Sequence, residues 1–302
     1  MTRFPLAAAL VLSFAATAVA QSPILGAPPT YATPAPSGVP NEDAIGTRIW
    51  APGLDAGYNP QGLTVIDGTV YVAAYRSDAR SVTRGPCRVF RIDPASGAET
   101  GHFDVPSPCG HAGGLAVAGD ARLYLADTHV LFAIDLDGAF AGAPHFLQWP
   151  LGPGLQGSLA ASDRGAVWIG SYETREPGRF FRFDTAILDR TEDGAMLMPE
   201  QASANMVIPM NAQGAAFDPS GKLWVARSGL KWGELVRLDP KSGQVERSFA
   251  FVPGIEGIAF DPAGRMWAAS EAGVRHYFDT SPAAAEAPFY PLVFGVDQTK
   301  LK

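Results

Sequence analysis

One pattern recurs five times along the chain, and it limits the possible folds more than any other feature of the sequence. Each copy has a glycine entering a short apolar run, then a polar turn, then a second run with an aromatic residue. The copies read PQGLTVIDGTVYVAAY (60–75), AGGLAVAGDARLYLADT (112–128), LQGSLAASDRGAVWIGSY (155–172), AQGAAFDPSGKLWVARS (212–228) and IEGIAFDPAGRMWAASE (255–271). Short runs of alternating polarity bounded by Gly, Pro and Asp are typical of antiparallel strands.

Two more runs follow each copy. The third runs end in aspartate and read CRVFRIDP, VLFAIDL, RFFRFDT, ELVRLDP and RHYFDT. The fourth runs are more polar and read TGHFDVP, HFLQWPL, NMVIPM, ERSFAFVPG and PFYPLVF. Four-stranded units that recur every roughly 40 to 55 residues indicate an all-β fold. Among all-β folds, this repeat is typical of a β-propeller with antiparallel blades.

The number of blades follows from the number of copies. We expect five blades, and the segment GTRIWAPG ahead of the first copy resembles another fourth strand. This N-terminal strand would complete the last blade and close the ring, which removes exposed sheet edges. Six blades are the alternative, but three further strands are then required, and the insertion AILDRTEDGAMLMPEQASA between the third and fourth copies does not supply them.

The N-terminus predicts export. Residues 1–20 carry Arg3, an apolar stretch and small residues before Gln21, as a cleavable signal peptide does. Residues 21–44 are rich in Pro and Ala and resemble a flexible or polyproline-like leader, which leaves 45–302 as a single propeller domain. We expect a secreted or periplasmic protein with no integral membrane segment after cleavage.

Charge and cysteine content narrow the function further. The net charge of -7 and the pI of about 5.2 disfavour nucleic acid as a partner. The chain has two cysteines, Cys87 and Cys109. In an oxidising compartment such a pair is more often a disulfide than a metal site, and the predicted strands place both residues on one face.

The propeller geometry gathers polar residues around one opening. In a propeller the first strand of each blade lines the central channel, and its start lies at the same end as the end of the second strand. The residues before the repeated glycines would therefore ring the mouth of a funnel; they are Gln61, Gly113, Gln156, Gln213 and Glu256. The ends of the second strands add Tyr75, Arg76, Asp127, Tyr172, Arg227 and Glu271. A concave polar mouth is a common place for a small ligand.

Two acids begin and end the last copy, Glu256 and Glu271. Adjacent carboxylates repel, so the pKa of one should rise, as a general acid or base requires. The same pair could instead hold a divalent cation, calcium or magnesium, for which oxygen ligands are suited. A third interpretation is purely structural: Glu256 pairs with Arg227 of the preceding blade, and Glu271 faces solvent.

Other candidates lie near the same mouth. His111, in CGHAGG, precedes the second blade and titrates near neutrality, although a loop histidine often only caps backbone groups. The loop RSDARSVTRGPC offers Arg76, Arg80 and Arg84 to an anionic ligand, or is simply a solvated basic loop. No Gly-x-Ser-x-Gly elbow, His-rich zinc motif or phosphate loop is present.

The segments QGAAFDPSGKLWVA and EGIAFDPAGRMWAA resemble the senescence-marker-protein/gluconolactonase propellers and their strictosidine-synthase-like relatives. The resemblance covers roughly residues 45 to 297 and implies the propeller fold. Gluconolactonases hydrolyse lactones with a divalent metal held by Glu, Asn and Asp in the funnel, several of them just before the glycine of the first strand. Here those positions read PQG, LQG, AQG and IEG, so Glu256 is the charged ligand that the ring retains. Strictosidine-synthase-like members can work with a single funnel glutamate and no metal, which Glu256 also resembles.

These observations predict an exported propeller that binds a small polar ligand and hydrolyses an ester or lactone. Glu256 would be the base or the metal ligand, and Glu271 would tune it. Arg227 and His111 would stabilise the oxyanion, while the amides Gln61, Gln156 and Gln213 orient hydroxyl groups. The alternative is a non-catalytic propeller that recognises a sugar or a peptide.

Overall fold

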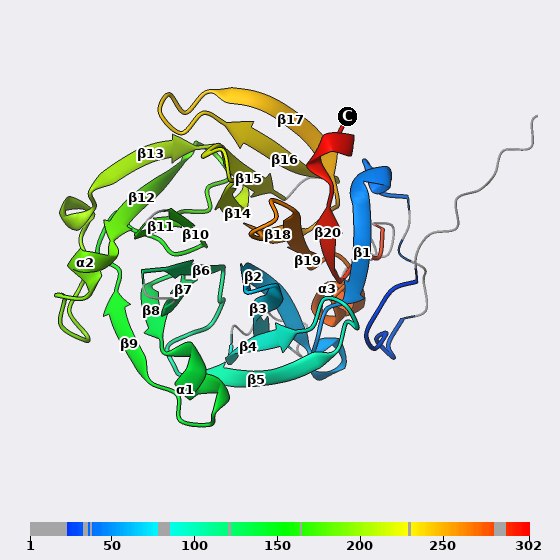
Figure 1. The fold of residues 1–302 in the computed structure, drawn as a ribbon, viewed down its shortest axis with the longest axis horizontal. Coiled ribbons are helices and arrows are strands. Elements are labelled where there is room, and N and C mark those ends of the chain that lie inside the picture. Colours follow the sequence, from blue (N-terminus) through cyan, green and yellow to red (C-terminus); the bar gives the residue numbers. More distant parts are fainter. Residues whose placement is uncertain are drawn as a thin grey trace, which may run out of the picture.

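The described part of the chain forms five separate four-stranded antiparallel sheets around one central axis (Figure 1). The structure is a computed structural model that describes residues 23–32, 36, 38–77, 85–119, 122–163, 165–228, 231–280 and 288–302. The prediction of a five-bladed β-propeller is therefore confirmed, and the six-bladed alternative is wrong.

Four blades are built from consecutive strands, and the first strand of each lies nearest the axis (Figure 1). The first blade contains β2 (Tyr58–Ile66), β3 (Thr69–Arg76), β4 (Cys87–Ile92) and β5 (Glu99–Val105). The second contains β6 (Gly114–Ala118), β7 (Arg122–Asp127), β8 (Val130–Ile134) and β9 (Phe146–Pro150). The third contains β10 (Leu159–Asp163), β11 (Ala166–Gly170), β12 (Gly178–Asp184) and β13 (Ala204–Ile208). The fourth contains β14 (Ala212–Phe217), β15 (Leu223–Arg227), β16 (Gly233–Leu238) and β17 (Val245–Phe251).

The fifth blade joins the two ends of the chain. It contains β18 (Ile255–Phe260), β19 (Met266–Ser270), β20 (Leu292–Val296) and β1 (Ile45–Trp50). The strand β1 pairs with β20 in an antiparallel register that places Trp50 opposite Leu292 (Figure 1). The predicted closure by an N-terminal strand is thus confirmed.

Two strand predictions for this blade are wrong. The run RHYFDT forms a helix, α3 (Arg275–Thr280), and PFYPLVF supplies the third strand of the blade, not the fourth. Because β1 already fills the fourth place, the C-terminal segment needs to contribute only one more strand. The run with five buried residues, Leu292–Val296, takes that place.

Short helices occupy connections between strands. The helices α1 (Leu136–Phe140) and α2 (Thr185–Leu188) follow the third strands of the second and third blades. Single 3₁₀ turns are formed by Glu42–Ala44, Leu54–Ala56, Pro199–Gln201 and Gln298–Lys300. Among the described residues, no helix combines the length and the apolar character that crossing a membrane requires.

Glycines let the inner strands approach one another at the axis. A Cβ atom on Gly214 would lie 2.3 Å from the main-chain oxygen of Glu256, and one on Gly257 would lie 2.5 Å from that of Gln61. No side chain fits at such distances, so the repeated glycine is a requirement of blade-to-blade packing at the centre. Beyond this ring the same strands line a cavity of about 240 Å³, which includes Leu63 and Phe217.

The repeated Asp and Trp of the hairpins bond to each other. The indole N–H groups of Trp168, Trp224 and Trp267 donate to the carboxylates of Asp163, Asp218 and Asp261 at 2.7, 3.0 and 3.4 Å. A tryptophan buried between blades needs a partner for its N–H group, and the turn aspartate supplies it. This bond explains why the two residues recur together in three of the five copies.

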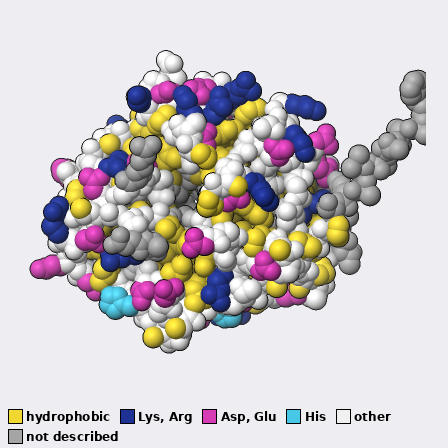
Figure 2. All heavy atoms as spheres, in the orientation of Figure 1, with side chains coloured by type: hydrophobic (Ala, Val, Ile, Leu, Met, Phe, Trp, Pro, Cys, Tyr) yellow, Lys and Arg dark blue, Asp and Glu magenta, His cyan; other side chains and the backbone are white. Residues whose placement is uncertain are grey.

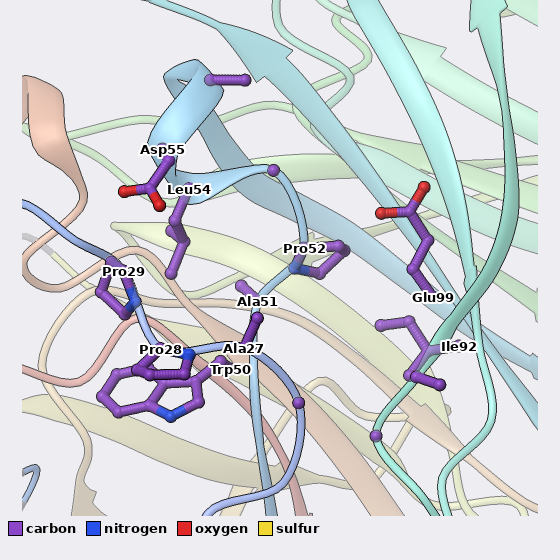
Figure 3. Close-up of a pocket in the computed structure, with 15 residues that line it drawn as sticks. Ala27, Pro28, Pro29, Trp50, Ala51, Pro52, Leu54, Asp55, Ile92 and Glu99 are labelled. Atoms are coloured by element: carbon purple, nitrogen blue, oxygen red, sulfur yellow. The ribbon is translucent and has the colours of Figure 1, made fainter.

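Part of the Pro/Ala-rich leader packs on the propeller. The main-chain N–H of Leu25 donates to Arg48 at 2.8 Å, and Leu25 accepts from Trp50 at 3.0 Å. Between the leader and the first and fifth blades lies a pocket of about 390 Å³, with Pro28, Pro29 and Trp50 in its wall (Figure 3). This pocket contains none of the predicted funnel residues. The predicted signal peptide, 1–20, lies outside the described residues.

The surface in view carries both signs of charge. Lys and Arg side chains are interspersed with Asp and Glu around its rim, and hydrophobic side chains gather toward its centre (Figure 2).

Candidate functional site

The funnel brings together residues that are far apart in the sequence. The amide nitrogen of Gln61 donates to Glu271 at 2.8 Å, and that of Gln213 donates to Glu256 at 2.9 Å. These bonds connect the first, fourth and fifth blades at the ends of strands that the sequence predicted to meet.

Irregular strand pairing accompanies the three ring residues that make these contacts. The register shifts between Pro60 and Leu63, between Ala212 and Gly214, and between Ile255 and Ile258. Gln61, Gln213 and Glu256 lie inside these shifts, whereas the corresponding pairs β6–β7 and β10–β11 have a regular register. A bulge re-aims the side chain at which it occurs, so the irregular pairing directs these three side chains into the site.

Glu256 and Glu271 form a hydrogen-bonded carboxyl pair at the centre of the site. Glu256 lies on β18 and is 1% exposed, while Glu271 directly follows β19 and is half-buried. The structural interpretation, in which Glu256 pairs with Arg227 and Glu271 faces solvent, is wrong. Arg227 instead forms an ion pair with Glu234, and its Nε donates to the main-chain oxygen of Met210 at 2.7 Å.

The pair holds a proton near neutral pH. Burial, and then the charge of Glu271, raise the pKa of Glu256 well above its usual range. Burial also raises the pKa of Glu271 to about 7, although hydrogen bonds from Tyr277 and Gln61 act in the opposite direction. Glu271 receives more donors than Glu256, so the proton resides on Glu256 and Glu271 is the acid that ionises first.

Two tyrosines, Tyr277 and Tyr172, interact with the pair. The negative charge of Glu271, and then burial, raise the pKa of Tyr277. Burial and both glutamates raise the pKa of Tyr172. Both tyrosines therefore stay protonated at physiological pH and can donate hydrogen bonds to the carboxyl groups or to a ligand.

Asp127 holds the loop that carries His111. Its Oδ1 accepts the main-chain N–H groups of Gly110, His111 and Ala112 at 3.2, 2.6 and 2.8 Å, and the residue is 5% exposed. The structure thus gives Asp127 a role in positioning this loop. The His111 ring lies against Tyr75 with 5.6 Å between the ring centres.

The predicted disulfide supports the same side of the site. Cys87 and Cys109 are bonded, with their Cα atoms 5.8 Å apart. Cys87 also lies opposite Tyr75 in the pairing of β3 with β4. The bond therefore ties the loop before His111 to β4, the strand that pairs with the one carrying Tyr75.

Two amides of the ring have side-chain oxygen atoms that accept no hydrogen bond within the described residues. Among the described residues, the Oε1 atoms of Gln61 and Gln156 are buried without a hydrogen-bond partner. A buried acceptor without a donor is costly, so each of these oxygens is suited to a donor group on a ligand. Gly113 adds no side chain because a Cβ there would lie 2.4 Å from the main-chain oxygen of Ser158.

The residues of the pair fit a divalent cation poorly. Gln61 and Gln213 each already donate to a carboxylate oxygen of the pair that an ion would need. Within the described ranges, the one trio of candidate ligand side chains close enough to share an ion is Cys87, Cys109 and Asp127, and the disulfide uses both sulfurs. Calcium takes about six to eight oxygen ligands. The arrangement therefore gives no support to a chemical step through a metal.

The predicted basic loop is only partly described. Arg76 is exposed, and its Nε donates to the main-chain oxygen of Ala56 at 3.0 Å. Arg80 and Arg84 lie outside the described residues.

Sequence reasoning missed Tyr277. It placed this residue on a strand, whereas α3 carries it to Glu271. Six residues of mixed polarity do not separate a helix from a strand, and no other signal marked this position.

Comparisons with known proteins support the fold. No family model matches the chain, and no curated protein matches it in sequence. A glutaminyl cyclase from Myxococcus xanthus is similar in structure, with a TM-score of 0.56 and 13% identity over 84% of this chain and 94% of that one. The calcium-binding protein regucalcin from Agrobacterium tumefaciens has a TM-score of 0.44 and 17% identity over 83% and 93% of the two chains. A luciferin-regenerating enzyme has a TM-score of 0.42 and 13% identity over 70% and 69%. At 13% identity the similarity to the glutaminyl cyclase shows the fold alone.

Proposed function

We propose that the protein is a hydrolase that cleaves an ester or lactone bond of a small polar substrate bound in the funnel. The observation that carries the proposal is the buried, proton-sharing pair of Glu256 and Glu271. Ionisable groups whose pKa values are strongly perturbed by burial and by each other are concentrated at active sites.

The exposure of the two acids suggests which of them is the base. The sequence suggested Glu256 as the base and Glu271 as the acid that tunes it, and the structure favours the reverse assignment. Glu271 is the more accessible acid, so we assign it as the general base that takes a proton from water as the water oxygen attacks the carbonyl carbon. When the tetrahedral intermediate collapses, Glu271 returns that proton to the leaving alkoxide. Glu256 remains protonated and donates a hydrogen bond to Glu271 throughout.

Other funnel residues would bind the substrate. The unpartnered Oε1 atoms of Gln61 and Gln156 would accept hydrogen bonds from substrate hydroxyl groups. Tyr172, which stays protonated near both carboxyl groups, is our candidate for the donor to the oxyanion. Arg227 is less suited to this task than the sequence suggested, because Glu234 already neutralises its charge.

The proposal is tested with a panel of lactones and aryl esters, assayed with a chelator and with added calcium or magnesium. We expect turnover that survives the chelator and that rises as the pH passes through about 7, where Glu271 ionises. Glu271→Gln should lower kcat by about 100-fold or more, the usual effect of removing a general base. Glu176→Gln, at an exposed glutamate, is the matched control and should retain full activity. If the wild-type protein turns over none of the panel with or without metal, the proposal is wrong, and binding of a sugar or peptide becomes the hypothesis to test.

A further inference from the structure

The helix α3 rests on the first blade although it belongs to the fifth. In Figure 1 the helix lies between the fifth blade and the first, and three consecutive residues near its start, Arg275, His276 and Tyr277, make the contacts that hold it there. Arg275 donates to the main-chain oxygen of Asp55 at 3.4 Å, and the ring of His276 contacts the Ser77 hydroxyl at 3.4 Å. Both Ser77 and His276 are at most 5% exposed, so this contact is inside the protein.

The third of these residues, Tyr277, reaches the carboxyl pair. Its ring packs against the hydrophobic cluster shared by the first and fifth blades. The centres of the Tyr277 and His276 rings are 4.8 Å apart. Its hydroxyl group donates a hydrogen bond to Glu271. The ring of Tyr277 is thus fixed by packing, and its hydroxyl group by the hydrogen bond to Glu271.

The two acids of the pair are supported unequally. Glu271 accepts a bond from Gln61 of the first blade and one from Tyr277 of α3, in addition to its bond with Glu256. Glu256 accepts from Gln213. Tyr172 and Tyr75 are the other titratable groups that act electrostatically on Glu271 or on its tyrosine partner.

We propose that Tyr277 is a positioning residue of the reaction: from a helix anchored on the first blade, its hydroxyl group fixes the orientation of the Glu271 carboxylate. The inference rests on the proposed function, in which Glu271 is the base that contacts the attacking water. A carboxylate held by two neutral donors from two different blades keeps one rotamer, and a base must be well oriented to accept a proton.

The test is Tyr277→Phe, which removes the hydroxyl group and leaves the packed ring in place. Loss of one hydrogen bond to a charged group corresponds to about a tenfold fall in kcat. KM should stay within about twofold, because Tyr277 acts through Glu271 and is not assigned a contact with the substrate. Tyr71→Phe is the matched control, since it makes the same chemical change at a buried tyrosine that packs on Phe140, outside the funnel.

A second readout does not depend on turnover. In protein with ¹³C-labelled glutamate side chains, the carboxyl resonance of Glu271 is assigned by its disappearance in Glu271→Gln. We expect this resonance to shift in Tyr277→Phe and to stay in place in Tyr71→Phe. An unchanged resonance in a folded Tyr277→Phe protein overturns the inference, and so does an unchanged kcat. If the wild type hydrolyses no substrate, the proposed function fails, but the resonance still decides whether Tyr277 positions Glu271.

Discussion

The carboxyl pair predicts an unusual dependence of stability on pH. Glu271 has a pKa of about 7 in the folded protein and an ordinary value of 4.5. Between these values the folded state binds a proton that the unfolded state does not bind. The free energy of unfolding therefore falls as the pH rises. The contribution of Glu271 is complete below pH 4.5 and is lost as the pH passes through about 7.

The size of the effect follows from the shift. One pKa unit corresponds to about 1.4 kcal/mol, so a rise from 4.5 to about 7 corresponds to about 3 kcal/mol. Glu271 is half-buried, and its remaining contact with solvent reduces this to about 2 to 3 kcal/mol. Most acids of a folded protein act in the opposite direction, since ion pairing lowers their pKa values.

Urea unfolding of the wild type and of Glu271→Gln, across the interval from pH 4.5 to about 7, measures this contribution. The wild type should lose about 2 to 3 kcal/mol relative to the variant over that interval. Glu176→Gln, which changes an exposed acid in the same way, should follow the wild type. Parallel curves for the wild type and Glu271→Gln would refute the reasoning, because the folded protein would then not hold the extra proton.

Three further predictions concern the parts of the fold that hold the site. Gly257→Ala should lower the thermal midpoint by more than any surface substitution, because its Cβ would lie 2.4 Å from the main-chain nitrogen of Leu63; an unchanged midpoint would show that the inner strands can separate. Asp127→Ala should cost about 2 to 3 kcal/mol in urea unfolding, since three main-chain N–H groups lose their buried acceptor, and Asp127→Asn should cost less. Replacing Cys87 and Cys109 by serine should cost about 3 kcal/mol, in line with other bonds that close loops of this length, and a variant as stable as the wild type would contradict that estimate.

The repeats of the sequence were sufficient to predict the propeller and its closure. Five glycine-led hairpins with an aromatic second run can be buried only by packing side by side, and a closed ring is the arrangement that leaves no hairpin exposed. The same repeats placed Gln61, Gln213, Glu256 and Glu271 at one end of the axis, where the structure finds them bonded.

Other features depended on contacts that no local pattern reveals. The segment of α3 could have been a strand by its own composition, but it is a helix in a fifth blade whose third and fourth places are filled by β20 and β1. Arg227 could have paired with either of two acids. In the structure it pairs with Glu234, which lies opposite it on the neighbouring strand β16, and not with Glu256 of the next blade.

The order of residues along the chain therefore determined the repeat, the ring and the set of polar side chains at its mouth, because these depend on periodicity and on the direction of each strand. Tertiary packing decided which of those side chains meet, which acid keeps the proton, and which residue from outside the repeat supports it. The contacts and the position of the proton depend on bulges, on burial and on the distances between blades. Such features arise only when residues more than 200 positions apart, such as Gln61 and Glu271, come together in the folded protein.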